Sequence, residues 1–227
     1  MFIDQYFLML VVPAMILSMV AQIMVKSTFA KYSRIRSSRN ITGQSAAQML
    51  MKASSINGVA IEAVGGSLTD HYDPGSKKVR LSEPVFGNSS IAAIGVAAHE
   101  AGHAIQHAKG YGPLVLRSTL VPAANIGSRF GPLLAMAGLF FFPGSPLFNI
   151  GIILFSGAVL FYLITLPVEF NASSRALAML RKENVLTPEE LDGAKKVLSA
   201  AAMTYVASAL TAVMSLLRLI LIARGRR

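Results

Sequence analysis

The chain of 227 residues contains no cysteine. This absence excludes disulfides and every zinc site built on thiolates. A metal bound by this protein must therefore be held by histidine, aspartate or glutamate. Histidine is scarce as well, and the search for imidazole ligands is limited to four positions: His71, His99, His103 and His107.

Charged residues are also few. Only 14% of the residues are charged and 53% are hydrophobic, whereas about 25% of a typical soluble domain is charged. This composition favours a membrane protein. The net charge of +10 is also found in nucleic-acid-binding proteins, but no nucleic-acid motif is present and the basic residues lie beside apolar runs. We therefore expect the lipid bilayer as a partner, and no nucleic acid.

The first long apolar run covers residues 7–25 and is long enough to cross a bilayer. A cleaved signal peptide would have a basic segment before this run and a small-x-small site after it, but Asp4 precedes the run and no such site ends it. A retained anchor is expected. Because five basic residues follow at once, the positive-inside rule predicts an external N-terminus and a cytoplasmic segment after the anchor. They are Lys26, Lys31, Arg34, Arg36 and Arg39.

A second apolar block, residues 118–166, is interrupted by Pro143-Gly-Ser-Pro146 and predicts a transmembrane hairpin. Its second half is a clear span, whereas the first half includes Arg129, which is costly in lipid. The last apolar segment, residues 201–223, contains Arg218 and either crosses the membrane or lies in its interface. We favour a crossing, which predicts about four transmembrane helices.

The intervening parts predict a small folded region. Residues 42–55 are typical of an amphipathic helix capped by Thr42, and residues 59–64, 67–72 and 78–82 of a small antiparallel β-sheet. The fold class expected is a mainly α membrane protein. Its predicted parts are an anchor (1–25), a cytoplasmic part (26–117), a transmembrane hairpin (118–166), further helices (167–200), and a C-terminal membrane helix with a basic tail (201–227).

The pattern His99-Glu100-x-x-His103 lies in a helical stretch expected from Ser90 to Lys109. Residues four apart share a helix face, so the two imidazoles can bind one ion, and Glu100 beside them can take a proton from a water on that ion. The preceding residues are small and apolar, and unpaired polar groups in such a buried helix are costly. The motif therefore predicts zinc-dependent peptide hydrolysis.

A catalytic zinc usually has three protein ligands. One zincin class places a third histidine ten residues after the first, which here is Lys109. His107 lies two turns from His99, and we expect it to have a supporting role, with metal ligation as an alternative. The other class uses a glutamate from a later helix, and Glu169 follows a membrane span at the start of a predicted helix. Balancing the helix dipole is its alternative role. The remaining acidic residues lie in polar stretches: Glu183, Glu189, Glu190 and Asp192.

Residues 67–74, 95–107 and 166–173 resemble the YugP-type neutral zinc metallopeptidases of bacterial membranes, and the similarity extends over nearly the whole chain. The chain is more distantly similar to HtpX-like and CAAX-prenyl proteases. In those families the glutamate of a Glu-x-x-x-Asp motif is the third zinc ligand, and Glu169 matches it. The resemblance implies a zincin-like core of the gluzincin type in a multi-pass protein of the bacterial cell membrane. The active site would face the cytoplasm.

Ser173 stands where the related motif has aspartate. That aspartate supports a zinc-bound histidine, and serine does so more weakly. Asp70 or Asp73 is therefore an alternative partner for the histidine.

The resemblance also implies a mechanism in which Glu100 is the general base. Candidates for stabilising the oxyanion are His71 and Tyr72, on the strand before the motif helix, and Arg175, six residues after Glu169. The substrate expected is a membrane-associated or unfolded protein or peptide. A non-catalytic metal-binding membrane protein and a structural membrane protein are alternatives. An intact Glu100 favours the peptidase, because metal storage needs no general base.

Overall fold

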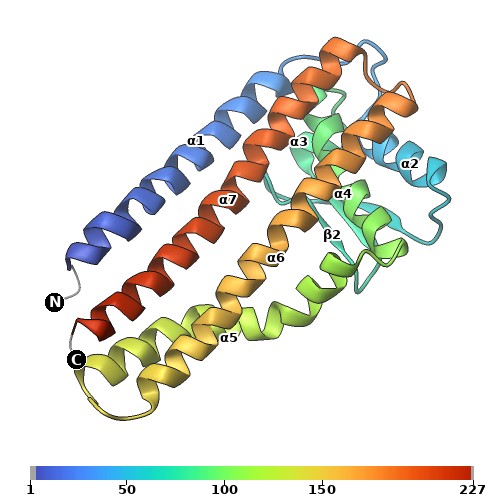
Figure 1. The fold of residues 1–227 in the computed structure, drawn as a ribbon. Coiled ribbons are helices and arrows are strands. Elements are labelled where there is room, and N and C mark those ends of the chain that lie inside the picture. Colours follow the sequence, from blue (N-terminus) through green and yellow to red (C-terminus); the bar gives the residue numbers. More distant parts are fainter. Residues whose placement is uncertain (1–3, 226–227) are drawn as a thin grey trace. The chain divides into compact units, whose positions relative to one another are not determined.

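The computed structural model describes residues 4–225, and most of them are helical. The chain forms two compact units. The first unit combines Met1–Gln22, Val115–Pro167 and Met203–Arg227, and the second combines Ile23–Leu114 and Val168–Ala202. The elements, labelled in Figure 1 where there is room, are a short π-helix η1 (Phe7–Val11), α1 (Val12–Ser33), α2 (Gly43–Ala53), β1 (Ala60–Val64), β2 (His71–Asp73), β3 (Lys78–Ser82), α3 (Glu83–Phe86), α4 (Ile91–Ala108), α5 (Gly112–Phe140), α6 (Leu147–Lys182) and α7 (Pro188–Arg224).

The second unit contains a three-stranded sheet of order β1-β3-β2. β3 pairs antiparallel with β2 but parallel with β1, so the sheet is mixed and the antiparallel prediction is wrong. Leu68 has a φ of 59°, which takes the backbone out of the extended region and delays the second strand to His71. Because the chain turns back twice between β1 and β3, these two strands run in the same direction.

Local capping sets the helix starts in this unit. The Thr42 hydroxyl accepts a hydrogen bond from the Ser45 amide at the start of α2, and the Ser90 hydroxyl accepts one from the Ala93 amide at the start of α4. α4 ends before Gly110, whose φ of 60° is favourable for glycine. The buried face of α4 consists largely of alanine, which lets neighbouring elements approach closely: Ala92, Ala93, Ala97, Ala98, Ala101 and Ala104.

α6 is continuous from Leu147 to Lys182, with Pro167 inside it. The expectation that a new helix opens at Pro167 is therefore wrong. Proline removes one intrahelical hydrogen bond, which the rest of this long helix tolerates. Glu169 consequently lies far from the helix start, and the dipole role suggested for it does not apply.

α7 begins with a capping box, which the pattern Thr187-Pro-Glu-Glu190 in the sequence predicts. The Glu190 amide donates to the Thr187 hydroxyl (3.3 Å) and the Thr187 amide donates to the Glu190 carboxylate (2.9 Å).

Three helical stretches are long and apolar enough to cross a membrane: Phe7–Ser33, Leu147–Lys182 and Pro188–Arg224. α5, expected as a fourth span, forms as a helix but is not among them. It contains Arg117, Arg129 and two internal prolines. Arg218, the unfavourable residue of the last span, donates two hydrogen bonds to Asp4 Oδ2 (3.0 and 2.7 Å). This pairing follows the rule that charged groups in apolar segments find a partner.

Candidate metal centre

The second unit brings together three side chains that can hold a metal ion: His99 and His103 from α4, and Glu169 from α6. His99 Nε2 lies 3.2 Å from both Glu169 Oε2 and His103 Nε2. His103 Nε2 lies 3.5 Å from the same carboxylate oxygen. Glu169 is 2% exposed and His103 9%, so the carboxylate and one imidazole are withdrawn from solvent.

The spacing of these three atoms matches zinc. Nitrogen and oxygen ligands bind zinc at about 2.0–2.1 Å, and in a tetrahedral arrangement they would be about 3.3–3.4 Å apart. The observed separations of 3.2, 3.2 and 3.5 Å lie close to that value. A set of two histidines and one glutamate is also a known donor set of catalytic zinc. The residues present therefore fit the ion that the motif predicts.

Gln106 determines the tautomer of His103. Its amide nitrogen donates to the Val168 carbonyl (2.8 Å) and to Asn171 Oδ1 (3.0 Å), so its oxygen must face His103 Nδ1 (3.0 Å). His103 Nδ1 therefore carries the proton, and the lone pair of Nε2 faces Glu169. Gln106 is fully buried and was missed from the sequence, where its place three residues after His103 was the only available signal.

Ser173 supports His99 directly. Its hydroxyl lies 3.1 Å from His99 Nδ1, on the side of the ring opposite the ligand nitrogen. The suggestion that Asp70 or Asp73 takes this place is wrong. Asp70 accepts hydrogen bonds from the Ser82 amide and hydroxyl, and Asp73 binds the turn at Gly75 and Ser76.

Glu100 follows His99 on α4 and is 7% exposed. Burial alone lowers the pKa of His103, but the hydrogen bond that the protonated ring donates to Glu169 and the charges of Glu100 and Glu169 raise it above its usual value. Two carboxylates thus favour positive charge at this place, whether on a proton or on a metal ion.

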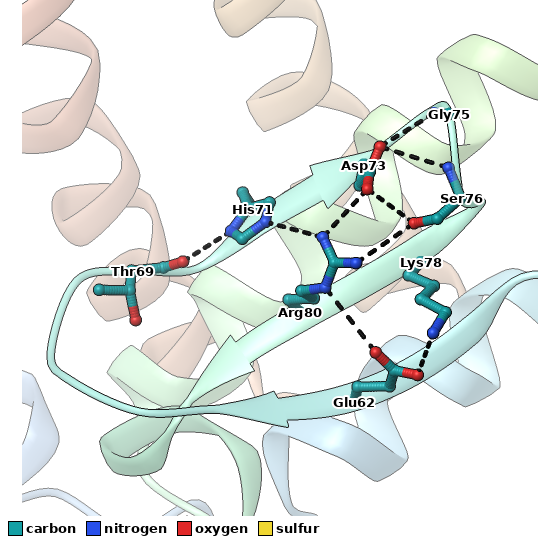
Figure 2. Close-up of polar contacts among 8 residues, drawn as sticks. All are labelled: Glu62, Thr69, His71, Asp73, Gly75, Ser76, Lys78 and Arg80. Atoms are coloured by element: carbon teal, nitrogen blue, oxygen red, sulfur yellow. Dashed lines mark hydrogen bonds and ion pairs between the residues drawn. The ribbon is translucent and has the colours of Figure 1, made fainter.

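His71 lies on the exposed face of the sheet, among charged side chains (Figure 2). Its Nδ1 lies 2.8 Å from the Thr69 carbonyl, and Arg80 Nη1 lies 3.3 Å from its Nε2. Arg80 also pairs with Asp73 (3.0 Å). Hydrogen bonds from Ser76, and then from Arg80 and Gly75, hold the pKa of Asp73 well below its usual range. These hydrogen bonds of His71 thus belong to the ion-pair network on the sheet and not to the metal ligands.

Tyr72 points to the other face of the strand, because successive side chains alternate. Its hydroxyl lies 2.7 Å from His107 Nδ1. Burial, with a further effect from the charge of Asp73, raises the pKa of Tyr72, so the phenol stays protonated and can donate to His107. His107 therefore has a supporting contact near the end of α4, as expected, and is not in the group of metal ligands found in residues 4–225.

Arg175 contacts the ligand group only indirectly. Its Nε donates to Asn171 Oδ1 (2.6 Å), and its guanidinium lies 5.8 Å from the centre of the Tyr111 ring. Asn171 in turn accepts from Gln106, which holds His103. Arg175 thus ends a chain of hydrogen bonds that begins at a candidate zinc ligand.

Comparison with known proteins agrees with this geometry. The family described as "putative neutral zinc metallopeptidase" matches residues 7–224. The chain belongs to this family. It is also 50% identical over 217 residues to the "putative membrane protease YugP" of Bacillus subtilis (strain 168), an alignment that covers 95% of this chain and 96% of the relative. No solved structure matches the chain.

Proposed function

We propose that this protein is a membrane-embedded, zinc-dependent endopeptidase of the gluzincin type, acting on membrane or unfolded proteins. The observation that carries the proposal is the triangle of His99 Nε2, His103 Nε2 and Glu169 Oε2, with separations suited to one zinc ion. The family and the 50% identical relative support peptide hydrolysis at a membrane.

In this proposal His99, His103 and Glu169 hold zinc, and Ser173 and Gln106 orient the two imidazoles. When bound, zinc polarises the scissile carbonyl and acidifies a water molecule. The Glu100 carboxylate takes the proton of the attacking water and passes it to the leaving amine. His71, Tyr72 and Arg175 stay the candidates for stabilising the oxyanion.

The proposed location is the bacterial cell membrane, with several crossings and the metal centre on the cytoplasmic side. Three apolar helices and the membrane protease among its relatives support membrane association. The basic residues after the anchor support the orientation.

The first experiment compares Glu100→Gln and Glu169→Gln with the wild type in detergent. We expect Glu100→Gln to keep about one zinc per chain and to lose about 10²–10⁴-fold in kcat on unfolded casein, because it removes only the proton acceptor. Glu169→Gln should lower zinc affinity by more than the 10–100-fold that is typical when a supporting residue is removed. Metal content by mass spectrometry and casein cleavage are the two measurements.

Glu183→Gln is the control, because Glu183 lies outside the ligand group. Zinc retained without any cleavage by the wild type would favour the alternative, a non-catalytic metal-binding membrane protein. Zinc retained by Glu169→Gln would contradict the ligand assignment.

A further inference from the structure

The first unit contains a slot of about 540 Å³ that lies apart from the metal ligands. Its walls come from α1, α5, α6 and α7, and three of these helices are apolar enough to cross a membrane. α1 and α7 run side by side in this unit (Figure 1), where the hydroxyls of Ser18 and Thr211 meet at 3.1 Å. The slot is thus built among the segments that would lie in lipid.

Polar groups line this slot although lipid surroundings would penalise them. Within residues 4–225, no hydrogen bond joins the side-chain amide of Gln22 or the side-chain hydroxyls of Tyr162 and Ser215 to another protein group. Leaving such groups without partners in an apolar medium is unfavourable, because they lose the hydrogen bonds that water would supply. Tyr162 and Ser215 are half-buried, so partners for their hydroxyls come from whatever fills the slot, whereas Gln22 is exposed and is also solvated from outside it.

The slot also presents a backbone acceptor. Pro132 lies in the slot wall inside α5 and has no N–H, so the carbonyl of Ser128, four residues earlier, lacks its usual helical donor. Ser208 adds a hydroxyl that donates to Thr204 within α7 and keeps lone pairs free to accept. Donors and acceptors for a polar guest are thus both present.

The shape of the slot suits an extended chain. Its lining on α7 runs from Ser208 to Leu219, about 16 Å at 1.5 Å per residue. That length accommodates about five residues of extended polypeptide. Val11, Met136 and Phe155 add apolar surface to the lining, which suits side chains that normally face lipid. Ser18, Thr211 and Arg218 add further polar groups. An acyl chain would fill the volume but leave the amide and hydroxyls without partners.

We propose that this slot is filled with water in the membrane and binds a short, unwound stretch of a membrane-inserted polypeptide. An unwound backbone can exist at membrane depth only where protein or water supplies its hydrogen bonds, and the slot supplies both. This inference deepens the proposed function, on which the peptide part rests, by assigning membrane-inserted polypeptides that can unwind as the substrate class.

The absence of cysteine allows a direct test of hydration. Single-cysteine variants Ser208→Cys and Ser215→Cys, reconstituted in lipid vesicles, are treated with a membrane-impermeant maleimide. We expect both to react at least about tenfold faster than Leu217→Cys, because thiolates form and react only where water reaches them. Leu217 is the matched control: it lies on α7, exposed and outside the slot. Labelling at the Leu217→Cys rate would overturn the proposal.

Peptide binding is tested in the Glu100→Gln background, so that no cleavage occurs. A synthetic leucine–alanine membrane-spanning peptide interrupted by Asn-Pro-Gly is added to vesicles containing Ser208→Cys. We expect loss of maleimide labelling with this peptide and unchanged labelling with the uninterrupted leucine–alanine peptide. Equal labelling with both peptides would overturn the peptide part.

Neither measurement requires zinc or hydrolysis. A negative labelling result would therefore not contradict the proposed zinc peptidase activity. Equally, a protein without peptidase activity could still show a hydrated slot.

Discussion

At the scale of single residues, the two imidazoles of the metal centre divide their nitrogens between two tasks. In each ring Nε2 faces Glu169, while Nδ1 faces a polar side chain: Ser173 for His99 and Gln106 for His103. The polar partner fixes the ring orientation and keeps the proton away from the nitrogen that would bind metal.

Ser173→Ala should weaken zinc binding about tenfold, the lower end of the range for supporting residues, because a serine hydroxyl is a modest acceptor. Ser173→Asp should bind zinc at least as well as the wild type, since a carboxylate accepts more strongly from Nδ1–H. Competition titration with a chromophoric chelator measures both. Ser174→Ala, at the exposed neighbouring position, is the control. Equal affinities for Ser173→Ala and Ser174→Ala would refute the role.

The Gln106 side chain has two roles that substitutions can separate. Its oxygen accepts from His103, and its nitrogen donates to the Val168 carbonyl. Gln106→Met should lower zinc affinity by about 10–100-fold, because His103 loses the acceptor of its Nδ1 proton. Gln106→Glu keeps an acceptor but cannot donate to the buried Val168 carbonyl, so it should retain zinc while losing about 1–3 kcal/mol of stability.

Chelator titration and thermal unfolding give the two readouts for Gln106. Gln48→Met on the exposed face of α2 serves as the control for both. If Gln106→Glu loses zinc as completely as Gln106→Met, the amide does not act through its oxygen.

At the scale of elements, the metal centre depends on the close approach of α4 and α6. Gly102 makes this approach possible, because a Cβ at this position would lie 2.7 Å from the carbonyl oxygen of Ala172. Gly102 lies between His99 and His103 in the sequence, and Ala172 lies between Glu169 and Ser173. Any separation of the two helices therefore moves the ligands apart.

Gly102→Ala should accordingly lower both zinc affinity and the thermal unfolding temperature, although alanine is the better helix former by about 0.5–1 kcal/mol. Gly95→Ala in the same helix is the matched control. A Cβ there would be 3.4 Å from the Ala194 Cβ, an ordinary contact, so stability should be unchanged or slightly raised. Zinc titration and thermal unfolding of both variants provide the comparison. Identical behaviour would show that helix spacing does not limit the site.

At the scale of the whole molecule, the orientation in the membrane is the main expectation to test. Single cysteines at Phe142, in the exposed α5–α6 connection, and at Ser76, in the exposed β2–β3 turn, mark the two sides. In spheroplasts an impermeant maleimide should label Phe142→Cys but not Ser76→Cys, and permeabilisation should expose both. The reason is the cluster of basic residues after the anchor, which favours a cytoplasmic sheet. The opposite labelling pattern would place the metal centre outside.

Features that rest on local chemistry were predictable from the sequence. Helix starts at Thr42, Ser90 and Thr187 follow from side chains that bond to amides within three residues, and the structure confirms each cap. The same holds for His99 and His103, whose spacing places both on one helix face. Glu169 was identified because few acidic residues follow the motif and because related proteins have glutamate there.

Features that depend on which segments meet were not predictable in this way, because they arise from the packing of distant parts of the chain. The parallel pairing of β1 and β3 and the continuity of α6 through Pro167 are not encoded by local pattern. The contact of Ser173 with His99 and the hydrogen bond of Gln106 to the Val168 carbonyl exist only because Gly102 lets α4 and α6 approach closely. These hydrogen bonds join residues 62 and 74 positions apart, so they depend on packing, and packing is a property of the assembled chain.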